Sequence, residues 1–164
     1  MMRPAAGGLR RLSSVGRYVT GLSNLALVAR LLACGLSLTI LKYVVPLPKL
    51  AAMMWAGDNG RCREPARDHR IAALAMWIGT AGRSLNRGRC LERSLLIYRM
   101  LSELNADSRL VVGVMKKDGH LIGHAWVCIG DELIGGSRAS VSDFLPIIVF
   151  GAGGTALPCP DVPA

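Results

Sequence analysis

Hydrophobic residues dominate the chain between residues 22 and 45, where Arg30 and Lys42 are the only charged side chains. Pro46 and Pro48 follow directly. Proline cannot continue a helix, because its nitrogen carries no hydrogen and its ring collides with the preceding turn. A long apolar run that ends at such a stop signal predicts a helix over 22–45.

A turn-forming cluster, Gly-Asp-Asn-Gly at 57–60, comes soon afterwards. Between the prolines and this cluster we predict a short helix over 49–56. Clusters of glycine, aspartate and asparagine mark loops between structured segments. We therefore divide the chain into an N-terminal basic and apolar helical region, 1–57, and a second region, 58–164.

In the second region, apolar residues recur twice at helical spacing. The first run predicts a helix over 64–84, with its apolar positions at Ile71, Leu74, Ala75 and Ile78. The second predicts a helix over 90–105, with an inward stripe of Leu91, Leu95, Tyr98 and Leu101. On that helix the charged residues are expected on the opposite, outer side: Glu92, Arg99 and Glu103.

Beyond residue 106 the pattern changes from helical to alternating. We predict strands over 109–115, 121–129 and 132–134, joined by tight turns at 117–119 and 130–131. Helices first and an antiparallel sheet afterwards define an α+β fold.

Alternation along the middle strand separates its side chains between two faces. His124, Trp126 and Cys128 fall on one face, and Ala125, Val127 and Ile129 on the other. We expect the second set to join the core. The first set is expected to present the imidazole of His124 toward the helix that starts at Cys90, with Trp126 shielding it from water.

The chain is strongly basic: it has 20 Lys and Arg against 11 Asp and Glu, which gives a formal net charge of +9. Such a balance favours an acidic partner. Aromatic residues make up only 5% and do not alternate with basic ones, which argues against nucleic acid. An acidic peptide or lipid headgroups fit better.

The apolar run does not have the form of a membrane span. A span needs about 20 apolar residues, and an arginine near its centre costs roughly 2.5–3.5 kcal/mol. Arg30 interrupts the run in this way, and it also argues against an export signal. We expect a buried or interfacial helix in a cytoplasmic protein, with peripheral contact with the inner membrane face left open.

Five cysteines, at 34, 62, 90, 128 and 159, have no CxxC spacing and do not form a disulfide framework. Cys34 and Cys128 are expected to behave as small buried hydrophobes. His120 and His124 lack the companion ligands of a zinc motif, so we expect no metal and no cofactor.

Cys90 and His124 are the candidate catalytic pair. Cys90 opens the helix predicted over 90–105, where exposed N–H groups and the helix dipole favour a thiolate. The backbone N–H groups there can also form an oxyanion hole, and Gly88 would let substrate backbone approach. A cysteine with a nearby imidazole is the basis of thiol nucleophile chemistry. The spacing alone leaves a purely structural role open for each residue.

Three segments of this chain together resemble the transglutaminase-like B2 proteins of lasso-peptide biosynthesis. They are Cys90-Leu91-Glu92-Arg93-Ser94-Leu95, Leu110-Val111-Val112-Gly113-Val114 and His124-Ala125-Trp126-Val127. Their order and separations agree with that family over residues 85–150. The resemblance implies a transglutaminase/papain-like core in 58–164, with the nucleophile at a helix N-terminus packed on a small antiparallel sheet.

The resemblance also implies an activity. It is that of a cysteine peptidase that removes the leader from a ribosomally made precursor before a cyclase closes the macrolactam. Cys90 would be the nucleophile and His124 the general base and acid. Gly88, Arg93 and Trp126 are the expected substrate contacts. The implied partners are the leader, a separate leader-recognition protein (the B1 or RRE partner) and an asparagine-synthetase-like cyclase.

One departure from that family concerns the residue that orients the histidine. The family places an aspartate about a dozen residues after the histidine, where this chain has Gly135-Gly136-Ser137. Asp143 is the candidate replacement. Loss of the orienting carboxylate lowers the rate of such an enzyme. Two alternatives therefore stay open, namely a non-catalytic adaptor that docks a leader or a membrane, and acyl transfer to an amine.

Overall fold

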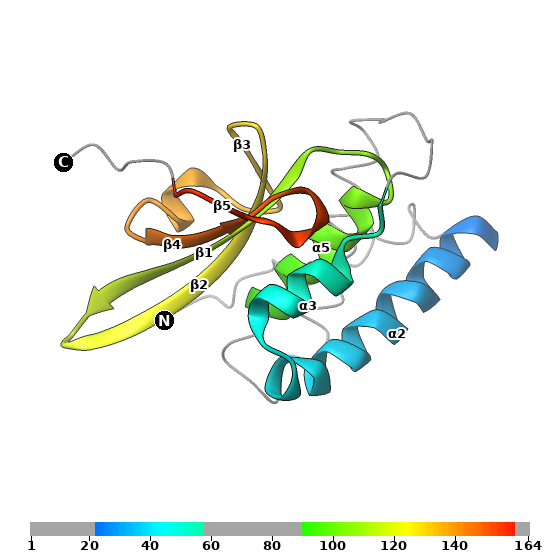
Figure 1. Ribbon diagram of the computed structural model, residues 1–164, viewed down its shortest axis with the longest axis horizontal. Helices are drawn as coiled ribbons and strands as arrows, with labels where there is room; N and C mark the ends of the chain where they lie inside the picture. Colours follow the sequence, from blue (N-terminus) through cyan, green and yellow to red (C-terminus); the bar gives the residue numbers. More distant parts are fainter. Residues whose placement is uncertain (1–21, 58–89, 160–164) are drawn as a thin grey trace, which may run out of the picture.

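The structure, a computed structural model, describes residues 22–57 and 90–159. In these ranges three α-helices lie on one side of a five-stranded antiparallel sheet, and α2 is the helix farthest from the sheet (Figure 1). The helices are α2 (Leu22–Val44), α3 (Leu47–Met54) and α5 (Cys90–Ser102). Of these, α5 contacts the sheet, and α2 packs on α5. The fold is α+β, as predicted.

The sheet has the order β3-β2-β1-β4-β5, with every neighbouring pair antiparallel. Its strands are β1 (Ser108–Lys117), β2 (His120–Ile129), β3 (Glu132–Ile134), β4 (Leu145–Phe150) and β5 (Ala156–Leu157). Asp118 and Gly119 form the tight turn between β1 and β2, with φ angles of 51° and 80°. Two successive positive φ angles are typical of a type I′ hairpin, which confirms the predicted turn.

The helices and one face of the sheet share a single hydrophobic core. The inward stripe predicted for α5 is confirmed, because Leu95, Tyr98 and Leu101 are fully buried. They pack with residues of α2, α3 and the sheet, among them Leu31, Leu38, Leu50, Leu110, Val127 and Phe150. Residues from both predicted regions therefore contribute to one core. The division at residue 57 stays a prediction.

Tyr98 connects α5 to the loop after β4. Its hydroxyl donates a hydrogen bond to the carbonyl of Gly151 and accepts one from the N–H of Gly154, at 3.2 Å. Burial raises the pKa of the phenol to about 12, so the hydroxyl stays protonated as a donor. This loop is in turn packed against α3: a Cβ atom added at Gly154 would lie 2.3 Å from the nitrogen of Ala52.

Most predicted elements are confirmed with shifted ends. α3 starts at Leu47 instead of residue 49, since Pro48 lies in its first turn, where no N–H is needed. α5 stops at Ser102 and β1 extends over Ser108–Lys117. β4 and β5 were not predicted, and the helix predicted over 64–84 lies outside the described residues. No described helix is long and apolar enough to cross a bilayer.

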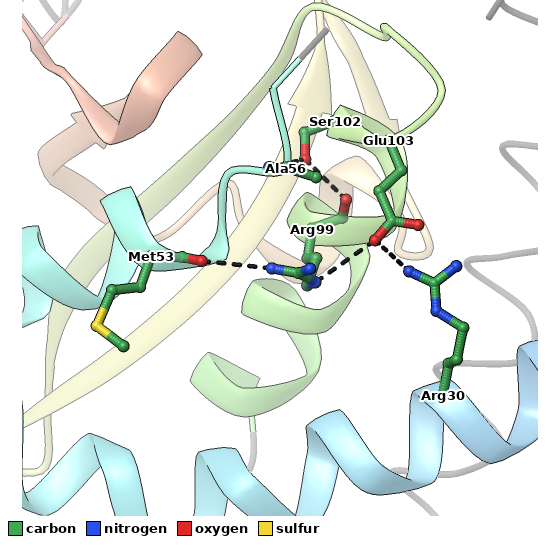
Figure 2. A network of polar contacts seen from close by, with 6 residues as sticks. All are labelled: Arg30, Met53, Ala56, Arg99, Ser102 and Glu103. Atoms are coloured by element: carbon green, nitrogen blue, oxygen red, sulfur yellow. Dashed lines mark hydrogen bonds and ion pairs between the residues drawn. The ribbon is translucent and has the colours of Figure 1, made fainter. Parts of the chain in front are cut away.

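The predicted outer side of α5, with Glu92 and Arg99 and with Glu103 directly after the helix, is not its solvent side, because α2 covers it. Glu92 and Glu103 are only 7% and 8% exposed. Lys42 of α2 lies 2.8 Å from Glu92, and Arg30 of α2 lies 2.6 Å from Glu103. Arg99 also reaches Glu103, and Figure 2 shows this cluster between the two helices. α2 covers this side of α5 and supplies the opposite charges.

Breaking one of these pairs is expected to destabilise the fold. Lys42→Met leaves the Glu92 carboxylate buried without its cation, and we expect the free energy of unfolding to fall by about 3 kcal/mol. The double variant Lys42→Met/Glu92→Leu removes both charges and is expected to recover most of that loss. Urea unfolding followed by circular dichroism measures both. Equal loss in the single and double variants would contradict the pairing.

Candidate active site

Cys90 is the first residue of α5, and its side chain is half-buried. Cys90 therefore lies in a helix, as predicted, while the exact start of that helix stays a prediction because residue 89 lies outside the described part of the chain. Residues 58–89 lie outside the described part of the chain, and Gly88, an expected substrate contact, is among them.

α5 meets β2 through a buried hydrogen bond one turn after Cys90. The hydroxyl of Ser94 donates to the carbonyl oxygen of Ala125, the neighbour of His124, at 2.8 Å. Residues four apart share a helix face, and the rise between them is about 6 Å. Cys90 thus lies on the side of α5 that meets β2, one turn before Ser94.

A small cleft of about 30 Å³ lies at this junction. It is lined by residues of α5, of β2 and of the segment after β3, namely Arg93, Ser94, Ile97, His124, Ala125, Trp126, Leu133, Ile134, Gly135, Gly136, Ser140 and Val141. The cleft brings together three of the predicted site residues, Arg93, His124 and Trp126. Cys90 does not line the cleft. Both Cys90 and His124 are described residues, and no hydrogen bond joins them.

His124 lies on β2, and its ring forms a three-membered aromatic cluster with Trp126 and Phe144, whose own centroids are 6.4 Å apart. Its centroid is 6.0 Å from that of Trp126 and 5.0 Å from that of Phe144. Burial lowers the pKa of the imidazole, and the positive charge of Arg93 lowers it further. Both causes disfavour the imidazolium, so the site holds His124 as a neutral ring able to accept a proton.

The predicted orientation of the two β2 faces is half right. Ala125 and Val127 are buried, and Val127 belongs to the core that α5 covers. His124 and Trp126 alternate with them and face the other side of the sheet, so the expectation that this face is turned toward α5 is wrong. His124 instead meets the helix around the free edge of β2, because β3 pairs with only Val127–Ile129.

The absence of a side chain at Gly113 leaves the space that the Trp126 ring occupies. Gly113 pairs with His124 across the β1–β2 ladder, and a Cβ atom there would lie 2.7 Å from the Trp126 ring and 2.8 Å from the Leu145 carbonyl oxygen. Any residue other than glycine at this position would collide with the Trp126 ring and with the backbone of Leu145. Neither Gly113 nor Phe144 was predicted to belong to the site. The signal available for Gly113 was a glycine inside a strand pattern, which often marks a close approach.

The residue that would orient His124 is not found among the described side chains. Asp143 is exposed, and the hydroxyl of Ser142 donates a 3.3 Å hydrogen bond to its Oδ1 atom. Its neighbour Phe144, and not Asp143, contacts the His124 ring. Gly135 and Gly136 line the cleft beside His124, so the sequence position expected to carry the aspartate lies in the right place but has no carboxylate.

A larger open groove of about 790 Å³ adjoins the cleft and shares Trp126, Leu133 and Val141 with it. It runs over the sheet face opposite α5. Its floor includes apolar residues, among them Val111, Val149, Pro146 and Leu157. Arg109, Arg138 and Asp131 also line it, leaving one net positive charge.

The other described cysteines have a different setting. Cys34 and Cys128 are half-buried, and burial raises the pKa of both thiols. Such thiols stay protonated and unreactive, consistent with structural roles. Within residues 22–57 and 90–159, no group of three or more His, Cys, Asp or Glu is arranged to hold a metal.

A family model described as the transglutaminase-like superfamily matches residues 37–149, from the middle of α2 to β4. The match covers more than half of the chain, which therefore belongs to this superfamily. Its members are commonly cysteine peptidases or acyltransferases. No curated protein and no solved structure matches the chain.

The state of His124 can be checked by titration. We expect its pKa, followed by NMR of the ring protons, to lie below the ordinary 6.5. Arg93→Gln should raise it part of the way, because burial remains, while Arg109→Gln serves as a charge-matched control outside the cleft. Since the folded state disfavours the imidazolium, His124 should also reduce stability as the pH falls below 6.5. A pKa unmoved by Arg93→Gln would contradict the assigned cause.

Proposed function

We propose that this protein is a cysteine peptidase that removes the leader from a ribosomally made lasso-peptide precursor, with Cys90 as nucleophile and His124 as general base and acid. The observation that carries the proposal is the junction of α5 and β2. Cys90 opens the helix, and one turn later Ser94 is bonded to the residue next to His124. Membership of the transglutaminase-like superfamily supports the same chemistry.

In the proposed reaction, neutral His124 takes the thiol proton as Sγ of Cys90 attacks the scissile carbonyl. Backbone N–H groups at the start of α5 stabilise the oxyanion. The imidazolium then gives its proton to the leaving amine, which departs as the new N-terminus of the core peptide. Water, deprotonated by His124, hydrolyses the thioester and restores the thiol. The burial of His124 and the nearby charge of Arg93 favour this neutral starting state.

The groove supports a peptide as the substrate. It continues from the His124 cleft across the outer face of the sheet, with Arg109 and Arg138 along it. An acidic peptide would also suit the net charge of +9. We propose the cytoplasm as the place of action. A separate leader-recognition protein would present the precursor, and a cyclase would take the cleaved product.

A second candidate is a non-catalytic adaptor that binds the leader without cutting it. The observation that favours it is the missing carboxylate: Gly135 and Gly136 line the cleft, and Asp143 is exposed and bonded to Ser142. An unoriented imidazole populates both tautomers and is a weaker base. Acyl transfer to an amine is a third outcome of the same thioester intermediate.

One incubation separates these functions. The full chain is mixed with a lasso-peptide precursor and a leader-recognition protein, and the products are followed by mass spectrometry. A peptidase yields two fragments whose masses sum to precursor plus one water. Intact precursor, with leader binding by fluorescence anisotropy, would support the adaptor instead. A leader fragment carrying an added amine would support transfer.

A further inference from the structure

The solvent-exposed face of α2 is apolar, whereas the exposed face of a surface helix is usually polar. Five large apolar residues are strongly exposed, from 45% for Leu32 to 76% for Tyr43. They are Leu32, Leu36, Ile40, Tyr43 and Val44, here called the apolar stripe of α2. At 100° per residue they fall within about 120° of arc. A contiguous patch of this kind marks an interaction surface.

The charges of α2 do not interrupt this stripe. Lys42 pairs with Glu92 and is only 18% exposed, while Arg30 reaches Glu103 across the helix contact (Figure 2). The hydroxyls near the stripe are also satisfied from within. Ser37 donates to the carbonyl of Ala33 at 2.9 Å, and Thr39 donates to that of Leu36 at 2.6 Å. Within the stripe the one polar group is the hydroxyl of Tyr43, and the Nζ atom of Lys42 lies 4.7 Å from the centroid of that ring.

The charge of the N-terminal region, residues 1–57, indicates which kind of surface would cover the apolar stripe of α2. Residues 1–57 contain seven Lys and Arg and no Asp or Glu. The described ion pairs of Arg30 and Lys42 engage two of the seven; of the other five, Lys49 is exposed on α3, and four belong to residues 1–21, outside the described part of the chain. Two copies that met through this stripe would each carry a net charge of +9, which disfavours a dimer. A surface that is both apolar and negatively charged fits.

We propose that α2 is an interfacial anchor that lies in the plane of an anionic lipid bilayer, with its apolar stripe at the boundary between headgroups and acyl chains. Helices of this type bury an apolar face about 5–10 Å deep and are held by basic residues. α2 lies on the side of α5 away from the sheet (Figure 1), so the groove on the opposite sheet face stays open to peptide.

Vesicle sedimentation tests the anchor with the full chain. The probes are vesicles of phosphatidylcholine alone and vesicles with added phosphatidylglycerol. We expect binding to the anionic vesicles at least about tenfold tighter than to the neutral ones, and weaker in high salt. Leu36→Ser/Ile40→Ser should reduce the anionic binding by about tenfold or more, because two exposed apolar side chains no longer enter the bilayer.

The matched control is Leu121→Ser/Ile147→Ser, which removes two similarly exposed apolar residues from β2 and β4. It should bind anionic vesicles like the unchanged protein, and circular dichroism should confirm that both variants fold. Equal loss in both variants, or no binding to anionic vesicles, would overturn the proposal. The proposal would also be overturned if light scattering without lipid showed a dimer of the unchanged protein and a monomer of Leu36→Ser/Ile40→Ser, because the stripe would then be a contact between copies.

Discussion

Cys90→Ala is expected to lower the rate of precursor cleavage by about a thousandfold or more, the loss typical of removing a covalent nucleophile. The reason lies in the position of the sulfur at the first described residue of α5, with the strand that carries His124 packed alongside this helix. The measurement is the initial rate of fragment formation by mass spectrometry, with the leader-recognition protein present throughout.

Cys34→Ala is the matched control for that variant. Its thiol is also half-buried, but burial raises its pKa, and it lies on α2, outside the His124 cleft and the groove. We expect it to retain most of the activity. Iodoacetamide near neutral pH should label Cys90 faster than Cys128 or Cys159. Full cleavage by Cys90→Ala would remove the nucleophile assignment.

Gly154→Ala is expected to lower the free energy of unfolding by about 4 kcal/mol, combining a left-handed backbone cost with overpacking. Gly154 has a φ angle of 71°, and its missing Cβ would lie 2.3 Å from the nitrogen and 2.4 Å from the Cα of Ala52. These are backbone atoms of α3, so they cannot rotate away as a side chain would. Chemical denaturation measures the loss.

Gly119→Ala separates the two contributions. Gly119 has a similar φ angle of 80° in the β1–β2 turn, but no atom lies within 4 Å of the position that a Cβ would take there. It should therefore lose only the backbone contribution, about 1–2 kcal/mol. If the two alanine variants were equally destabilised, the contact between α3 and the loop after β4 would have no part in stability.

The sequence predicted the parts of the site that depend on local pattern. The helix that contains Cys90 followed from the helical spacing of apolar residues there, and the separation of His124 from Ala125 followed from strand alternation. These features need no knowledge of distant residues. The turn at Asp118 and Gly119 was predicted for the same reason.

The features that the sequence did not predict depend on segments far apart in the chain. In an isolated helix Glu103 would be an exposed charged residue. It is buried here because α2 packs over it and Arg30, 73 residues earlier in the chain, supplies the opposite charge. The side of the sheet that α5 covers is likewise fixed by packing and not by alternation, which separates two faces without saying which is inside. β4 was not predicted because Leu145–Phe150 is apolar throughout, without the alternation of a half-buried strand, and has a proline at its second position.

The contact between Gly154 and Ala52 has a consequence for how the protein is made. The ribosome releases the N-terminal helices roughly a hundred residues before the loop that packs on them, so α3 emerges with its inner surface uncovered. Contacts between such distant segments form late and slow folding, because a long loop must close first. In nascent chains stalled before the loop emerges, Ala51, which is fully buried in the complete fold, should therefore stay accessible to proteases and chaperones.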